Sequence, residues 1–324
     1  MTSIPDHKPT FHAGEVAVQQ RLGVDDKMAH IGAQVIRDHM PQQHRDFFAQ
    51  LPLVVLGALD ADGQPWASIL SNPPGFISTP DEVTMQINAG TLAQDPLHEA
   101  LVPGAAIGLL GIELHTRRRN RMNGVIEQAG PKPHGLTVKV SQSFGNCPKY
   151  IQARTPSFVQ PDTKVTTMAR TASALDATTR SIIERADTFF IASAHPMAHV
   201  GATASQGVDV SHRGGKPGFV RVDDDTHLTA PDYIGNFFFN TLGNLTLNPR
   251  AGLLFIDFDN GDLLYLAVTT EIAWDAHVTA EFTGAERLLR FKLQTLTYLP
   301  AALPLRWGPS ALSPYLARMA DQEG

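Results

Sequence analysis

Two halves of this chain of 324 residues show the same motifs in the same order. PWASILSNPPGF in the first half aligns with VDVSHRGGKPGF in the second, which places Gly75 over Gly218, 143 positions later. GLLGIEL from Gly108 aligns in the same way with GLLFIDF from Gly252, 144 positions later. Shared apolar composition of two strands is the alternative explanation. Two separate motifs at nearly one offset favour an internal duplication, and hence two copies of one folding unit.

Each copy consists of short apolar segments separated by turn residues. In the first copy, FFAQLPLVVLGAL, QPWASILS, residues 83–87, AAIGLLGI, RRRNRMNGVI and GLTVKVSQ are strand candidates, with DADG and NPPG as turns. Many short strands with few helices predict a mainly β chain of two small tandem barrels with flanking helices. We place N-terminal helices and the first barrel in residues 1–155, and the second barrel with a C-terminal extension in residues 156–324.

Three stretches have helical spacing of apolar residues. Residues 14–40 predict two short helices with a break near Gly23, and residues 172–185 and 286–296 predict one helix each. In the second half, Asn236 is predicted to cap a helix that Asn248-Pro249 ends.

Composition limits the classes of function. Hydrophobic residues make up 43% and charged residues 18%, as in a globular protein, and the net charge of -6 gives no overall attraction to nucleic acid or to anionic lipid. The chain has neither an apolar run that spans a bilayer nor the layout of a secretory signal at its start. The lone Cys147 forms no internal disulfide. We therefore expect a cytoplasmic protein with no nucleic-acid or membrane partner.

The candidate site lies in the second copy, where a strand ends at a pair of glycines. Ser211, His212 and Arg213 precede Gly214-Gly215, so their donors lie where the backbone can approach a phosphate closely. A solvated strand end is the alternative interpretation.

The first copy lacks these donors. It has Ser68, Ile69 and Leu70 at the matching positions, without the imidazole and the guanidinium. We therefore expect one working site per chain, in the second copy.

A second polar group follows in the predicted helix. Asn236, Asn240 and Asn244 are spaced i, i+4, i+8, so they form a row of amides beside a helix start, which favours an anionic ligand. A solvent-facing row is the alternative. Tyr233, in the preceding loop, either covers a ring system or anchors the loop.

Other polar clusters receive no chemical role. The basic run Arg117, Arg118, Arg119 and Arg121 is interpreted as a solvated face, with a phosphate grip as the alternative. Cys147 has no neighbouring base in sequence. His195 and His199 are separated by Pro196, so we assign no metal site. No catalytic residue is assigned.

The motifs of the second half resemble a known family. The run from Gly207 to Phe258, with DVSHRGGKPGF, PDYIGN, LGNL and NPRAGLLFIDF, resembles the pyridoxamine 5'-phosphate oxidase-related FMN-binding proteins, which have the split-barrel fold. The first half, with FHAGE, PWASILSNPPGFIS, RRRNRMNG and SFGNCPKYIQ, is similar to the N-terminal part of a long-chain subgroup with two tandem barrels. The resemblance implies FMN as cofactor, a homodimer with FMN at the subunit interface, and oxidoreductase chemistry on an unknown substrate.

The resemblance also implies which residues bind FMN. The strand that grips the phosphate falls on Ser211, His212 and Arg213. The next strand and loop, which border the flavin ring and the ribityl chain, fall on Ala230, Pro231, Asp232 and Tyr233. The helix start falls near Asn240 and Thr241, where the oxidase has an Arg-Lys pair. Without that pair, phosphate binding is expected to depend on Arg213, Asn236 and the helix N-terminus.

The reaction stays open. The Pro-rich end lacks the basic substrate motif of the oxidase, which argues against pyridoxamine phosphate as the substrate. The alternative function is a non-catalytic protein that binds, stores or senses flavin, or that binds haem or a deazaflavin, since split barrels host these as well.

Overall fold

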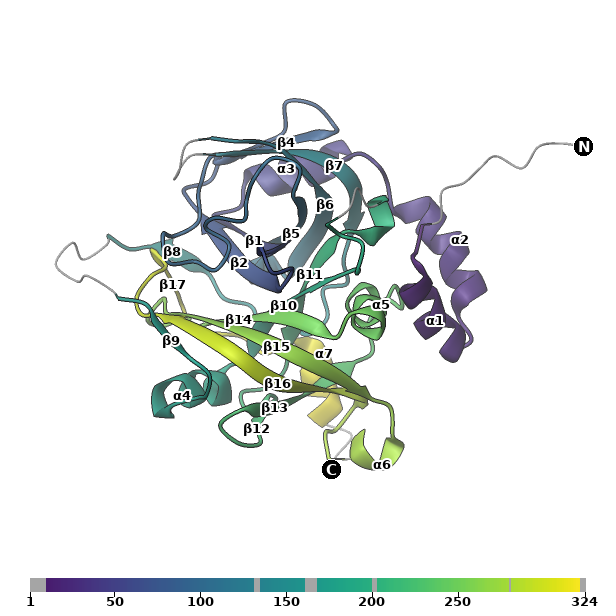
Figure 1. Ribbon diagram of the computed structural model, residues 1–324, viewed down its shortest axis with the longest axis vertical. Coiled ribbons are helices and arrows are strands. Elements are labelled where there is room, and N and C mark those ends of the chain that lie inside the picture. Colours follow the sequence, from purple (N-terminus) through teal and green to yellow (C-terminus); the bar gives the residue numbers. More distant parts are fainter. Residues whose placement is uncertain (1–9, 131–134, 161–167, 200–202, 280, 321–324) are drawn as a thin grey trace, which may run out of the picture.

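Two curled antiparallel sheets are stacked on one another, one from each half of the chain (Figure 1). The computed structural model describes residues 10–130, 135–160, 168–199, 203–279 and 281–320. The first sheet has the order β2-β1-β5-β6-β7-β4-β3 and the second has β11-β10-β14-β15-β16-β13-β12, with β9 added to β16. The prediction of a mainly β chain of two split barrels is confirmed.

The strand bounds of the first half are β1 (Leu53–Leu59), β2 (Pro65–Ser71), β3 (Ile77–Ser78), β4 (Thr84–Ile87), β5 (Ala106–Glu113), β6 (Arg118–Ala129) and β7 (Leu136–Gly145). Those of the second half are β9 (Arg170–Ala172), β10 (Thr188–Ala194), β11 (Val208–Gly214), β12 (Arg221–Val222), β13 (His227–Tyr233), β14 (Arg250–Ile256), β15 (Leu263–Ala273) and β16 (Ala285–Leu299). A separate small sheet pairs β8 (Pro156–Phe158) with β17 (Leu305–Trp307).

The two sheets agree in register as well as in strand order. β1 begins with Leu53 opposite Ser71 of β2, and β10 begins with Thr188 opposite Gly214 of β11. The turns after β2 and β11 each contain a glycine with positive φ, Gly75 at 98° and Gly218 at 84°, which only a residue without Cβ adopts readily. Strand order, register and turns therefore match the alignment made from the sequence.

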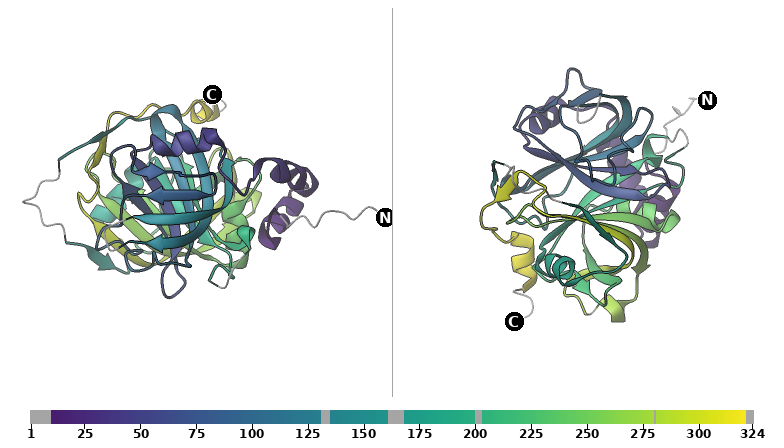
Figure 2. Two further views of the ribbon diagram at one scale, coloured as in Figure 1. Left: turned by 90° about the horizontal axis from the view of Figure 1, so that it is seen from above. Right: turned by 60° about the vertical axis from the view of Figure 1, so that its left-hand side comes forward.

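The barrels meet through strands β1, β2 and β5 of the first half and β10, β11 and β14 of the second, as the stacked view shows (Figure 2). Close contact depends on two matched glycines. A Cβ at Gly108 would lie 2.5 Å from the carbonyl oxygen of Val208, and one at Gly252 would lie 2.5 Å from Cα of Trp66. Since van der Waals contact between such atoms needs more than 3 Å, both positions require glycine.

The helices lie around the barrels. They are α1 (Ala13–Arg21), α2 (Asp25–Val35), α3 (Gln42–Ala49), α4 (Ala177–Arg185), α5 (Asn240–Leu247), α6 (Ala276–Thr279) and α7 (Pro314–Ala320). The two helices predicted within residues 14–40 are present, and Gly23, with φ of 65°, lies between them. Helix α1 packs on α5 of the second half, as Figure 1 shows.

Two helix predictions are wrong. Residues 286–296 lie in strand β16, because from Arg290 the burial alternates with a period of two, which is the pattern of a strand with one buried face. Helix α5 begins at Asn240 rather than beside Asn236, because Phe239 has a left-handed backbone that starts the helix three residues later.

No helix among the described residues is long and apolar enough to cross a membrane.

Replacing Gly252 with alanine tests the contact between the barrels. The new Cβ collides with the backbone of Pro65 and Trp66, so we expect the free energy of unfolding to fall by about 1–3 kcal/mol, the scale of overpacking in a core. Chemical denaturation measures the difference. Gly207→Ala is the matched control, because a Cβ there meets nothing within 4 Å. Equal stability of the two variants would contradict the close packing.

Candidate functional site

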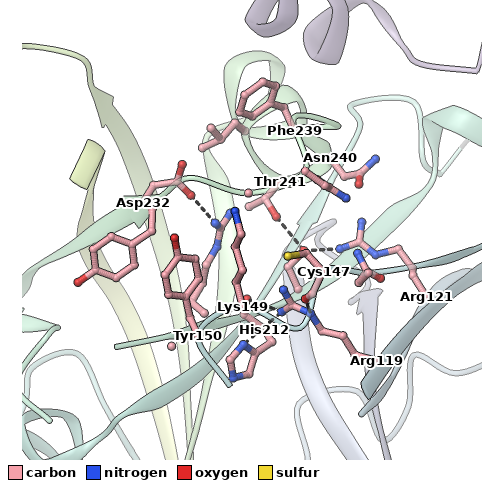
Figure 3. A pocket seen from close by; sticks show the side chains of 18 of the residues that line it. Arg119, Arg121, Cys147, Lys149, Tyr150, His212, Asp232, Phe239, Asn240 and Thr241 are labelled. Carbon is pink, nitrogen blue, oxygen red and sulfur yellow. Dashed lines mark hydrogen bonds and ion pairs between the residues drawn. The ribbon is translucent and has the colours of Figure 1, made fainter. Parts of the chain in front are cut away.

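A pocket lies between the two halves of the chain. Strands β11 and β13 and the start of α5 form the wall from the second half, while β6 and the segment after β7 form the wall from the first half (Figure 3). The lining residues are Leu110, Arg119, Arg121, Asn146, Cys147, Lys149, Tyr150, Ser211, His212, Arg213, Gly214, Pro231, Asp232, Tyr233, Gly235, Asn236, Phe237, Phe239, Asn240, Thr241 and Leu242. Four of these side chains are cationic and one, Asp232, is a carboxylate.

Arg121 crosses from the first half of the chain to residues 209–211 of β11. Its guanidinium donates to Asp209 Oδ1 at 2.8 Å, to the Val210 carbonyl at 3.0 Å and to the hydroxyl of Ser211. The residue is 2% exposed, so the paired carboxylate offsets the cost of burying a charge. Within the described part of the chain, the Nε atom of Arg121 has no hydrogen-bond partner.

Arg119 lies two residues earlier on β6 and points to the same side of the strand. Its Nε donates to the Cys147 carbonyl at 2.6 Å, and its Nη1 donates to His212 Nδ1 at 3.2 Å. Burial lowers the pKa of Arg119 to about 10, which leaves it charged at neutral pH. No carboxylate among the described residues forms an ion pair with it. A half-buried cation without a carboxylate partner favours an anion at this point.

His212 accepts a hydrogen bond from Arg119. Burial lowers the pKa of His212 well below its ordinary value, and the nearby Arg119 acts in the same direction. The imidazole is therefore neutral, which suits Nδ1 as the acceptor of the Arg119 proton. Its ring packs against Phe190 at 5.7 Å between centroids.

Arg213 of β11 is held by a carboxylate on β13, a strand that does not pair with β11 in the sheet. Asp232 accepts a hydrogen bond from Arg213 and lies 3.1 Å from Nε of Arg287, so it is shared between two guanidinium groups. Both Asp232 and Arg287 are buried. The hydrogen bond to Asp232 fixes the direction of the Arg213 side chain along the pocket wall.

Aromatic side chains form the opposite end of the pocket. Tyr150 packs on Tyr233 with 5.0 Å between ring centroids, and its hydroxyl donates to the Ile234 carbonyl at 3.1 Å. Burial raises the pKa of both tyrosines to about 12, so both are neutral at physiological pH. Figure 3 shows Tyr150 and Lys149 on the side of the pocket opposite Arg121.

The start of α5 closes the pocket with an unusual loop. Phe237 and Phe239 have φ angles of 63° and 60°, a left-handed conformation that costs free energy in residues with a bulky side chain. Asn236 accepts from the amide of Phe238 at 3.2 Å, and Gln19 of α1 donates to the Phe238 carbonyl at 3.3 Å. Helix α1 thus helps to hold the loop that places the helix N-terminus.

The predicted row of three asparagines on one helix face is not present. Asn236 lies in the loop before the helix. Asn240 lines the pocket and donates to Glu15 of α1, whereas Asn244 is buried behind the pocket and donates to Asp209 at 3.0 Å. The error follows from the later helix start, which removes Asn236 from the helical repeat.

Most residues predicted for the site come together in this pocket. Ser211, His212, Arg213, Pro231, Asp232, Tyr233, Asn236, Asn240 and Thr241 line it, whereas Ala230 and Asn244 do not. Ala230 is instead buried in the core of the second barrel.

Sequence reasoning missed the contribution of the first half. The interpretation of the basic run as a solvated face is wrong for Arg119 and Arg121, which enter the pocket. It holds for Arg118, which is exposed and lies over the ring of Phe47. The alternation of arginines along a strand was the available signal, because residues two apart share one face.

Cys147 and His195, which received no chemical role in the sequence analysis, also belong to no metal-binding cluster among the described residues. Cys147 lines the pocket and is partly exposed. His195 packs on His12 with 4.9 Å between ring centroids. Within the described ranges, no group of three or more His, Cys, Asp or Glu side chains is arranged to hold a metal.

Residues 40–169 match the family model for pyridoxamine 5'-phosphate oxidase. Over this stretch the chain is similar to the pyridoxamine 5'-phosphate oxidase family. The resemblance inferred from the sequence is thereby confirmed, although the match covers the first barrel, whereas the most specific motifs were identified in the second. No curated protein matches the chain.

Solved structures show weaker likeness. An FAD-binding protein of Mesorhizobium loti is 16% identical, with 41% of this chain and 98% of that one covered and a TM-score of 0.28. An FMN-binding protein of Syntrophomonas wolfei is 12% identical, with 38% and 88% covered and a TM-score of 0.27. The inhibitor of motility of Bacillus subtilis is 6% identical, with 84% and 96% covered and a TM-score of 0.23. Because these TM-scores are below 0.5, we draw nothing further from them.

Glu15 of α1 provides a test of how the N-terminal helix supports the pocket. Burial raises its pKa well above the ordinary value, and nearby Asp209 acts in the same direction. A raised pKa in the folded state contributes stability below the pKa of the unfolded carboxyl, about 4.3, and this contribution is lost as the pH rises through the folded pKa. Glu15→Gln removes the ionisation, so we expect the variant to gain stability relative to wild type as the pH rises.

Thermal unfolding of both proteins between about pH 5 and pH 8 measures this gain. Glu127→Gln, at an exposed position, is the control and is expected to show a constant difference from wild type. A constant difference for Glu15→Gln as well would contradict the buried, protonated carboxyl.

Proposed function

We propose that the chain is an FMN-binding flavoprotein with oxidoreductase activity, and that the pocket between its two halves holds the flavin. The convergence of Arg119, Arg121, Lys149 and Arg213 on one pocket, with a single carboxylate among the lining residues, supports this proposal most directly. Charge-assisted hydrogen bonds from guanidinium groups favour a phosphate, which is the charged end of FMN.

Polar atoms without partners gather at the same pocket. Nε of Arg121, Nε of Arg213, Nε2 of His212 and Oδ1 of Asn146 are buried and make no hydrogen bond to any residue that the structure describes. Buried polar groups are rarely unpaired in proteins, so several at one pocket favour a polar ligand that completes them. The residues present therefore fit a phosphate-bearing group.

The rest of the pocket suits the other parts of FMN. The first turn of α5 adds backbone N–H groups that point out of the helix and favour negative charge. Tyr150 and Tyr233 offer aromatic surface, and Phe237 and Phe239 line the pocket near the helix start. A planar tricyclic ring packs well against such faces. When bound, the flavin would carry out the transfer of hydride and electrons, and the protein side chains would bind and orient it.

The lining also offers a replacement for the Arg-Lys pair that the oxidase has at its helix start. Asn240 and Thr241 occupy that place here, and Thr241 donates to Ser211 at 3.0 Å. Arg119 and Arg121 reach the same pocket from β6. We propose that these two arginines provide the positive charge that the helix lacks.

Two variants of the same basic run test FMN binding. Arg119→Ala removes a charge-assisted donor from the pocket, so we expect FMN affinity to fall by about 1.5–3 kcal/mol, or about tenfold to a hundredfold in Kd. Arg118→Ala is the matched control, because its side chain lies over Phe47 outside the pocket. Quenching of flavin fluorescence measures both. Equal loss in both variants, or no FMN binding by wild type, would contradict the proposal.

Redox turnover distinguishes the oxidoreductase from the non-catalytic alternative. We expect bound FMN to be reduced by a nicotinamide nucleotide and reoxidised by an added acceptor, as followed by the flavin absorbance. Flavin that binds tightly and stays oxidised under these conditions would instead support a protein that stores or senses flavin.

A further inference from the structure

We infer that each chain is its own partner: its first half completes the single ligand site of its second half, and the matching position in the other half is closed. This inference rests on the proposed function for the identity of the ligand. It differs from the homodimer implied by the resemblance, in which a second subunit supplies the other wall of the site.

Both walls of the pocket come from one chain through direct contacts. Arg121 of β6 binds Asp209 and Ser211 of β11, and Asn123 of β6 donates to Asp209 at 2.8 Å. Arg119 reaches His212 in the same way. Asp209 is buried, so this contact is part of the internal packing between the halves.

The packing of the halves resembles that of a twofold dimer. Gly108 of β5 lies on Val208 at the start of β11, and Gly252 of β14 lies on Pro65 and Trp66 at the start of β2. These contacts match one another in the alignment of the two halves, as the reciprocal contacts of a twofold interface do. Because this face of each barrel is already covered within the chain, a second copy has no access to it.

The strand registers identify the position that corresponds to the pocket in the other half. Leu110 pairs with Arg121 as Leu254 pairs with Tyr265, and Ile112 pairs with Arg119 as Ile256 pairs with Leu263. Tyr265 and Leu263 thus occupy the places of the two arginines. On β2, Ser68, Ile69 and Leu70 occupy the places of Ser211, His212 and Arg213.

Side chains fill this second position. The hydroxyl of Tyr265 donates to Asp95 Oδ2 at 2.9 Å, and the hydroxyl of Ser68 donates to the same oxygen. In the open pocket Thr241 makes the corresponding bond to Ser211. Asp95, Tyr265, Ser68 and Leu263 are all buried. A carboxylate at this place, together with the loss of all three guanidinium groups, disfavours a phosphate.

Complementation between two defective chains tests where the walls come from. Arg119→Ala damages the first-half wall and Arg213→Ala damages the second-half wall. We expect the two chains, coexpressed with different tags, to bind no more FMN than the single variants. If the walls came from different subunits, mixed dimers would contain intact sites, and recovery of up to about a quarter of wild-type binding would overturn the inference.

Stoichiometry tests the closed position. We expect wild type to bind one FMN per chain, and Tyr265→Phe, which alters only the closed position, to bind one with unchanged Kd. Two FMN per chain, or one FMN per two chains, would overturn the inference.

A measurement without ligand separates this inference from the proposed function. Arg121→Ala and Asp209→Ala each break the buried pair between the halves, so each is expected to lower the thermal unfolding midpoint. When the Arg121→Ala and Asp209→Ala chains are coexpressed, we expect the mixture to unfold at the midpoints of the two single variants. A new transition at the wild-type midpoint would overturn the inference. Failure of wild type to bind FMN would reject the proposed function alone and leave this result valid.

Discussion

The site depends on two arginines between the barrels, of which Arg121 is buried and Arg119 is half-buried. A guanidinium removed from water needs acceptors, and Arg121 finds them in Asp209, the Val210 carbonyl and Ser211. Among the described residues, the acceptors of Arg119 are all neutral: the carbonyls of Cys147 and His212 and the imidazole of His212. The excess positive charge therefore faces the pocket, where a bound anion would balance it. His212 stays neutral beside Arg119, because its own burial lowers its pKa and the charge of Arg119 acts in the same direction.

The duplicated fold explains how one chain brings these groups together. Strand β6 belongs to the first barrel and β11 to the second, and close packing at Gly108 and Gly252 brings their ends within hydrogen-bond distance. The same packing generates a second position by symmetry, and there Tyr265 and Asp95 make a closed, buried hydrogen bond. The two positions have the same backbone pattern and opposite chemistry, so function here depends on side chains and not on the fold.

The sequence predicted the parts that depend on local pattern and on repetition. The two barrels and the helices before them follow from alternation, turn residues and repetition. Ser211 and Arg213 follow from their place before a pair of glycines, whereas Asp232 was assigned to the site through the family resemblance. The start of α5 did not, because it depends on left-handed Phe237 and Phe239, which α1 and the pocket hold in place. Strand β16 was mistaken for a helix because its apolar residues first run together at Leu288 and Leu289 before they alternate.

The role of Arg119 and Arg121 depends on contacts across about 90 residues of chain, which no local pattern reveals.

The most direct test of the account is the structure of the chain with FMN bound. The account predicts the FMN phosphate within hydrogen-bond distance of Arg119 of the first half and of Arg213 of the second half of the same chain. A phosphate bound elsewhere, or held by residues of only one half, would contradict it.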